Sequence, residues 1–376
     1  MAGYSEYADQ EQDLERAFDH LSALSDVAGP AGFESQVTDY TAASLSALGW
    51  DVRSDALGSC IARLGASAAA RRGAETPLRV MLAAHCDEIG LMITAVEKTG
   101  FLRFTTIGGV DSGAIYGREV VVQGRRPVAG IIATTPPHIT PVEDRRRWLP
   151  PDELVIDIGL SQEAAEQAVR PGDPVTFHEP LRRLAGGRAA GKALDNRAGL
   201  AAMLLAGHEL AERRRNCEIF LVATVQEEVG LRGALTSAFG IVPHVGIAVD
   251  TTMGAQPSTS PARTCLLDGG PAVGVGPNIH PAVHRALLAA GRSGRLPCQL
   301  EPLPANSGTD AWAMQVTRAG VATGVVSVPI RNMHTPVETV SLRDILWTAR
   351  LLAEFTATAD TSLRPALTGL LGGKFL

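Results

Sequence analysis

The stretch IFLVATVQEEVG, residues 219–230, is an apolar run that ends abruptly in two adjacent carboxylates. The run from Ile219 to Val225 has the length and β-branched content of a buried strand, and Gly230 allows a sharp turn just beyond it. Taken alone, Glu227 and Glu228 are best explained as solvated residues at the end of that strand. Features elsewhere in the chain favour a different explanation.

The bulk composition describes a globular chain. With 376 residues, of which 45% are apolar, it can bury a sizeable core in two or three domains. Its 34 basic and 40 acidic residues are interspersed, and a net charge of −6 indicates neither nucleic acid nor anionic membrane as a partner. The N-terminal sequence lacks the features of a signal peptide, and no uncharged run reaches the roughly 18 residues of a spanning helix. We therefore expect a cytoplasmic protein.

The pattern of apolar residues, Gly and Pro changes twice along the chain. Between about 89 and 190, short β-like pieces alternate with Gly and Pro, which predicts a small barrel or sandwich. Outside this region, single apolar runs alternate with helical segments, the pattern of an α/β sheet covered on both faces. We expect an α/β fold in which a three-layer α/β/α domain, residues 1–88 and 191–376, contains an inserted β-rich barrel domain, residues 89–190.

Acidic residues and histidines recur at the ends of the predicted strands, where open α/β sheets bind ligands. Five places carry them, namely His85 with Asp87 and Glu88, Asp195, Glu227 with Glu228, Asp250, and His334. Each has a structural explanation: Asp195 as a helix N-cap, Asp250 in a turn, and His85 or His334 as a core or loop histidine. Their recurrence favours a nitrogen and oxygen site for Zn²⁺, Co²⁺ or Mn²⁺, with no thiolate required.

Six motifs carry a specific resemblance, and they stand in one order along the chain. They are AAHCDEIGLMI (83–93), KALDNRAG (192–199), VQEEVGLRGA (225–234), VDTT (249–252), NSGTDAW (306–312) and PIRNMHTPVE (329–338). Together they resemble the motif set of the M42 family of dinuclear metallo-aminopeptidases, which includes the tetrahedral TET peptidases. The resemblance covers almost the whole chain, and it implies a hydrolase that removes N-terminal amino acids from short peptides.

The resemblance also implies a set of metal ligands. Asp195 would bridge two divalent ions, His85 and Asp250 would complete one site, and Glu228 and His334 the other. Two metals that share a water need one short bridging carboxylate, and Asp195 is suited to that position.

Further roles follow from the same resemblance. Glu227 would be the general base that takes a proton from water and passes it to the departing amine. Asp87 would lie behind His85 and fix the tautomer of its imidazole. Asp310 would orient a loop or the amine of the substrate. The inserted domain would form dimers, and dimers would assemble into a hollow tetrahedral homododecamer.

Two positions depart from the family pattern. Cys86 stands between His85 and Asp87, as either a small buried side chain or a thiol close to the metal site. Asn332 stands where family members often carry tyrosine, a difference that concerns the substrate pocket rather than the metal ligands.

Two other functions compete with the aminopeptidase. A di-metal amidohydrolase or deacylase that acts on a small metabolite could use the same scaffold, and blocked substrates would distinguish it. A non-catalytic assembly protein would be expected to have lost at least one ligand, whereas every expected ligand and Glu227 are present.

Overall fold

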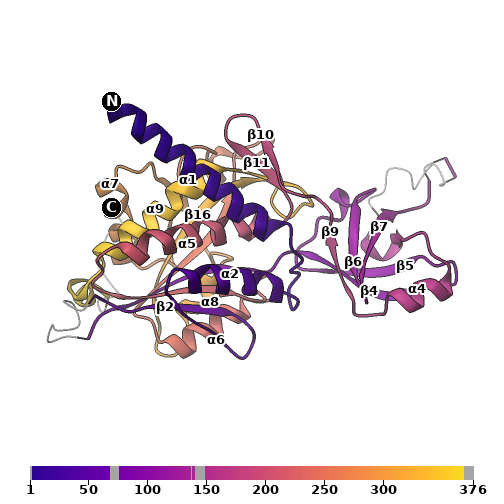
Figure 1. The fold of residues 1–376 in the computed structure, drawn as a ribbon, viewed down its shortest axis with the longest axis horizontal. Helices are drawn as coiled ribbons and strands as arrows, with labels where there is room; N and C mark the ends of the chain where they lie inside the picture. Colours follow the sequence, from indigo (N-terminus) through magenta and orange to yellow (C-terminus); the bar gives the residue numbers. More distant parts are fainter. Residues whose placement is uncertain (1, 68–75, 137, 140–148, 368–376) are drawn as a thin grey trace.

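The computed structural model describes residues 2–67, 76–136, 138–139 and 149–367. Figure 1 shows an elongated molecule in which a large α/β body carries a smaller β-rich unit at one end. None of the described helices is long and apolar enough to cross a membrane.

A large mixed sheet forms the centre of the α/β body. Among the described residues it has 11 strands, nine of them in one continuous path. In spatial order these are β1 (Asp51–Ser54), β2 (Cys60–Leu64), β12 (Glu218–Thr224), β3 (Arg79–His85), β13 (Val245–Met253), β16 (Ala322–Arg331), β17 (Glu338–Ser341), β11 (Arg188–Gly191) and β10 (Arg182–Leu184). β14 (Ala272–Val275) pairs with β16 and with β15 (Gln299–Pro302). The four strands β12, β3, β13 and β16 are parallel, and their burial on both faces explains their continuous apolar sequences.

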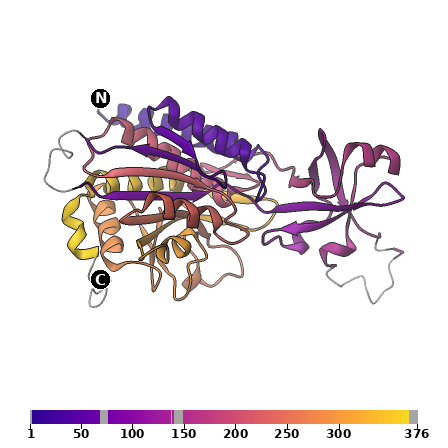
Figure 2. The same cartoon turned by 90° about the horizontal axis from the view of Figure 1, so that it is seen from below.

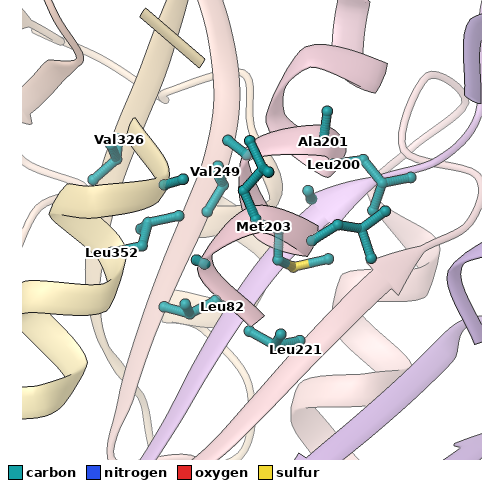
Figure 3. Close-up of a cluster of buried hydrophobic side chains, with 14 of the residues drawn as sticks. Leu82, Leu200, Ala201, Met203, Leu221, Val249, Val326 and Leu352 are labelled. Carbon is teal, nitrogen blue, oxygen red and sulfur yellow. The ribbon is translucent and has the colours of Figure 1, made fainter. Parts of the chain in front are cut away.

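Helices cover both faces of this sheet, as Figure 2 shows. One face carries α1 (Ala2–Ser25), α2 (Ser35–Ala47), α5 (Leu194–Glu212), α7 (Pro281–Ser293) and α9 (Leu342–Thr358). The other carries α6 (Arg232–Ile241) and α8 (Asp310–Gln315). In the larger core, Leu200 and Met203 of α5 lie with Leu82 and Leu221 of the central strands (Figure 3). The expected three-layer α/β/α fold is therefore confirmed.

The β-rich unit is a closed barrel with its own apolar core. In order around the barrel, its strands are β4 (Gly90–Val96), β5 (Leu102–Ile107), β8 (Val155–Asp157), β7 (Pro127–Ala133), β6 (Glu119–Gln123) and β9 (Pro174–Phe177). The short helix α4 (Gln162–Ala168) packs against it through Ala165. β10 lies in the large sheet although it precedes residue 191, because its hairpin partner β11 pairs with β17.

The parallel strands place their carboxyl ends at one edge of the large sheet. In their register, Thr224 at the end of β12 is opposite His85 at the end of β3. Ala83 is opposite Ala248, so two residues further on His85 is level with Asp250 on β13. Residues that follow these strands therefore converge on one region.

Candidate metal centre

His85 and Asp250 lie side by side on neighbouring strands. Their side chains are almost completely buried, and His85 Nε2 is 3.6 Å from Asp250 Oδ1. This proximity follows directly from the parallel register of β3 and β13.

Asp195 lies between two imidazoles. Its Oδ1 is 3.2 Å from His85 Nε2, and its Oδ2 is 3.5 Å from His334 Nε2. Asp195 is not a helix N-cap: its backbone is non-helical, with ψ of 106°, and it is Asn196 Oδ1 that accepts from the N–H of Gly199, at 3.0 Å. Its carboxylate is consequently free to present one oxygen to each histidine.

The side chains of the two glutamates after β12 lie near different histidines. Glu228 Oε1 is 3.7 Å from His334 Nε2, whereas Glu227 Oε2 is 4.0 Å from His85 Nε2. Asp87 holds both backbones, because its Oδ1 accepts from the N–H of Glu227 and its Oδ2 from the N–H of Glu228, each at 3.0 Å. Asp87 Oδ1 also lies 3.5 Å from His85 Nδ1, on the side of the imidazole away from Asp195.

His334 follows β16 in a left-handed conformation with φ of 61°. Its imidazole is backed by the segment that leaves β5, since a Cβ added at Gly109 would lie 2.8 Å from His334 Nδ1. Nearby Asn332 also has a positive φ, and its backbone N–H donates to Gln256 Oε1.

Glu338, which the sequence motifs do not single out as a site residue, contacts the backbones of two expected ligands. Its buried carboxylate accepts from the backbone N–H of Asp195 and from that of His334, both at 2.9 Å. One feature of the sequence could have indicated it. Glu338 is an acidic residue four positions after His334, at the start of a short strand whose last two residues are buried.

The expected ligand side chains form two groups, called the metal groups below, that share one residue. The donor atoms of His85, Asp195 and Asp250 lie within 4.8 Å of one another, and so do those of Asp195, Glu228 and His334. Imidazoles and carboxylates of this kind suit Zn²⁺, Co²⁺ or Mn²⁺. Cys86 belongs to neither group: its Sγ donates to the Thr224 carbonyl at 3.0 Å, and burial raises the pKa of its thiol.

Several buried carboxylates crowd this region, and the pKa values of its titratable groups are shifted. Burial raises the pKa of Glu227 to about 10 and the pKa of Glu228 to about 7. The hydrogen bond with Asp195 raises the pKa of His334 to about 9. Divalent cations would favour the ionised carboxylates, so the electrostatics fit a dinuclear metal site.

Asp310 lies near the groups but belongs to neither. It begins α8, and its Oδ2 accepts from Thr224 Oγ1 at 2.5 Å. Its Oδ1 is buried and has no hydrogen-bond partner among the described residues, and burial raises the pKa of this carboxyl to about 7. Asp310 thus supports the end of β12, from which the two glutamates follow.

The two groups open into a cavity of about 1270 Å³. Its walls come from the end of β13, the segment 261–265, the segment 300–309 and Trp312. A space of this size accommodates a small ligand that reaches both groups.

This chain is similar to known proteins over most of its length. A family model described as M42 glutamyl aminopeptidase matches residues 65–351. A curated protein named lysyl aminopeptidase from Pyrococcus furiosus is 37% identical over 330 residues, which cover 86% of this chain and 92% of the relative. The structure of an aminopeptidase from the archaeon Desulfurococcus kamchatkensis has a TM-score of 0.87 at 33% identity, with 95% of this chain and 99% of the other covered. The TET1 peptidase of Pyrococcus horikoshii, described as able to assemble into a tetrahedron or a large octahedral shell, has a TM-score of 0.80 at 30% identity, with 91% of this chain and all of the other covered.

Proposed function

Because this chain belongs to the M42 glutamyl aminopeptidase family and is an aminopeptidase, we propose that it releases N-terminal residues from short peptides at a dinuclear metal site. The observation that carries this proposal is the position of Asp195, with one carboxylate oxygen toward His85 and the other toward His334. The membership expected from the six motifs is confirmed.

Two divalent ions would be held by the chain. His85, Asp195 and Asp250 would hold one, and Asp195, Glu228 and His334 the other. When bound, such ions lower the pKa of a water and polarise the peptide carbonyl. Zn²⁺, Co²⁺ and Mn²⁺ all suit these ligands.

The remaining carboxylates would move and position the proton. Glu227 would accept a proton from the attacking water and deliver it to the departing amine, as its buried position next to His85 allows. Asp87 would fix the backbone of Glu227 and Glu228 and orient the His85 ring. Asp310 would hold the end of β12 through Thr224.

The domain division and the assembly are also proposals. Residues 1–88 and 191–376 would form the catalytic domain, and residues 89–190, which contain the closed barrel, would form a dimerisation domain. The hairpin of β10 and β11 at this boundary belongs to the large sheet of the catalytic domain. The similarity to the TET1 peptidase supports a homo-oligomer built from dimers, with a tetrahedral dodecamer as the expected form. A cytoplasmic location likewise stays a prediction.

A substrate panel tests the reaction. The metal-loaded wild type and Glu227→Gln would be compared on aminoacyl chromogenic substrates and on their N-acetylated forms, with Glu218→Gln as the matched control at the opposite end of β12. We expect only free-amine substrates to be cleaved, and we expect Glu227→Gln to lose about 100-fold or more in kcat while it still binds metal. Cleavage of the acetylated substrates instead would favour a deacylase, and full activity of Glu227→Gln would exclude it as the base.

A further inference from the structure

One more acidic side chain lines the cavity without belonging to either metal group. Glu301 lies on β15, in the cavity wall. Ser327 Oγ donates to Glu301 Oε2 at 2.7 Å, and Thr252 also hydrogen bonds to this carboxyl. These two neighbours fix the position of the Glu301 carboxylate.

The register of the sheet places this carboxylate near the metal groups. Ser327 pairs with Asp250 across β16 and β13. Thr252 is two residues beyond Asp250 on β13, on the same face and about 7 Å further along the strand. That spacing is comparable to the reach of a long side chain from a substrate whose α-amine lies at the metal groups.

Within the part of the chain that the structure describes, nothing balances the charge of Glu301. Among the described residues, no lysine or arginine forms an ion pair with it. Arg263 is the one arginine or lysine in the described cavity wall, and its side chain is exposed on the segment Pro261–Arg263. Burial raises the pKa of Glu301, and a cation beside it would favour the ionised carboxylate.

Apolar groups line the same wall. Met253 and Leu300 are half exposed, and Cys265 and Leu303 also line the cavity. A lysine or arginine side chain could lay its methylene groups on such a surface and direct its charged end toward the carboxylate.

We propose that Glu301 binds the ammonium or guanidinium group of the N-terminal residue of the substrate, so that the enzyme selects peptides that begin with lysine or arginine. This inference rests on the proposed aminopeptidase function. The pairing of a desolvated carboxylate with a cationic side chain gives specificity because the same carboxylate repels N-terminal Glu or Asp.

The test compares lysyl, arginyl, leucyl and glutamyl chromogenic substrates in the wild type, Glu301→Gln, Glu301→Lys and the control Glu218→Gln. We expect Glu301→Gln to lower kcat/KM for the lysyl and arginyl substrates by about 10- to 100-fold, with the leucyl value within about threefold of the wild type. Glu301→Lys should invert the order of the lysyl and glutamyl substrates. Glu218→Gln should resemble the wild type throughout.

The leucyl substrate separates the possible failures. If Glu301→Gln lowers the leucyl and lysyl values equally, or if the wild type prefers the glutamyl substrate, Glu301 does not select for basic residues although the aminopeptidase function stands. If the wild type cleaves none of the four free-amine substrates, the proposed function fails, and the inference fails with it. Circular dichroism of each variant shows whether an activity loss reflects misfolding. If Glu301→Lys misfolds, the isosteric Glu301→Gln decides the outcome.

Discussion

The backbone N–H of His334 donates a hydrogen bond to Glu338 Oε1 at a distance of 2.9 Å. The other oxygen of Glu338 accepts from the backbone of Asp195 at the same distance. One buried carboxylate therefore fixes two residues of the metal groups that are far apart in sequence. We therefore expect Glu338 to be a positioning residue, because its contacts are with the backbones of the expected ligands.

Substitution of Glu338 should weaken metal binding. In Glu338→Gln the amide N–H₂ faces one of the two backbone N–H groups, so one hydrogen bond is lost and a repulsive contact replaces it. We expect the affinity for Zn²⁺ or Co²⁺ to fall by about 10- to 100-fold, measured by competition with a chromogenic chelator. Glu218→Gln makes the same chemical change away from the site and should retain wild-type affinity; an unchanged affinity in Glu338→Gln would remove Glu338 from the positioning role.

Gly109 supports the His334 ring from the barrel side. A Cβ added there would lie 2.8 Å from His334 Nδ1, closer than real Cβ atoms approach, so Gly109→Ala should displace the imidazole. We expect the affinity for one metal ion to fall by about tenfold or more, while the fold is retained. Gly240→Ala is the matched control, since an added Cβ meets nothing within 4 Å there. Equal metal affinity in both variants would show that the contact does not position His334.

The metal-free chain should become less stable as pH rises. The pKa of Glu228 is raised from 4.5 to about 7, and that of Glu227 from 4.5 to about 10, so the folded state holds these protons more tightly than the unfolded state. His334, raised from 6.5 to about 9, acts in the same direction. Stability contributed by these groups is present below about pH 4.5 for the carboxyls and 6.5 for the imidazole, and it is lost toward pH 10.

Thermal unfolding of the chelator-treated protein between pH 5 and pH 10 measures this effect. Asp195 adds no slope in this range because its pKa is lowered from 3.8. Added metal ions should remove most of the decline, because they bind the deprotonated ligands and so stabilise the folded state at higher pH. A metal-free protein that grows more stable from pH 6 to pH 9 would contradict these pKa shifts.

Much of the fold could be predicted because apolar runs and strand ends carry a strong sequence signal. The buried run from Ile219 is a strand that ends at Thr224, one residue before the predicted end. The residues expected at the strand ends converge because parallel strands place their carboxyl ends at one edge.

Other features depend on contacts that sequence patterns do not encode. Glu338 meets the backbone of Asp195 across 143 residues, and Asp87 meets the backbone of Glu227 across 140. The positive φ of Ala193 and the pairing of β11 with β17 are two further cases. Local propensity could not have indicated any of them.

The central claim is that Asp195 belongs to both metal positions, and metal content per chain tests it most directly. After loading and removal of free ions, the wild type should hold two Zn²⁺ or Co²⁺ ions per chain by elemental analysis. His334→Ala should retain one, whereas Asp195→Ala should lose tight binding of both, because its carboxylate is shared between the groups. A single ion in the wild type, or two retained ions in Asp195→Ala, would contradict the bridging arrangement.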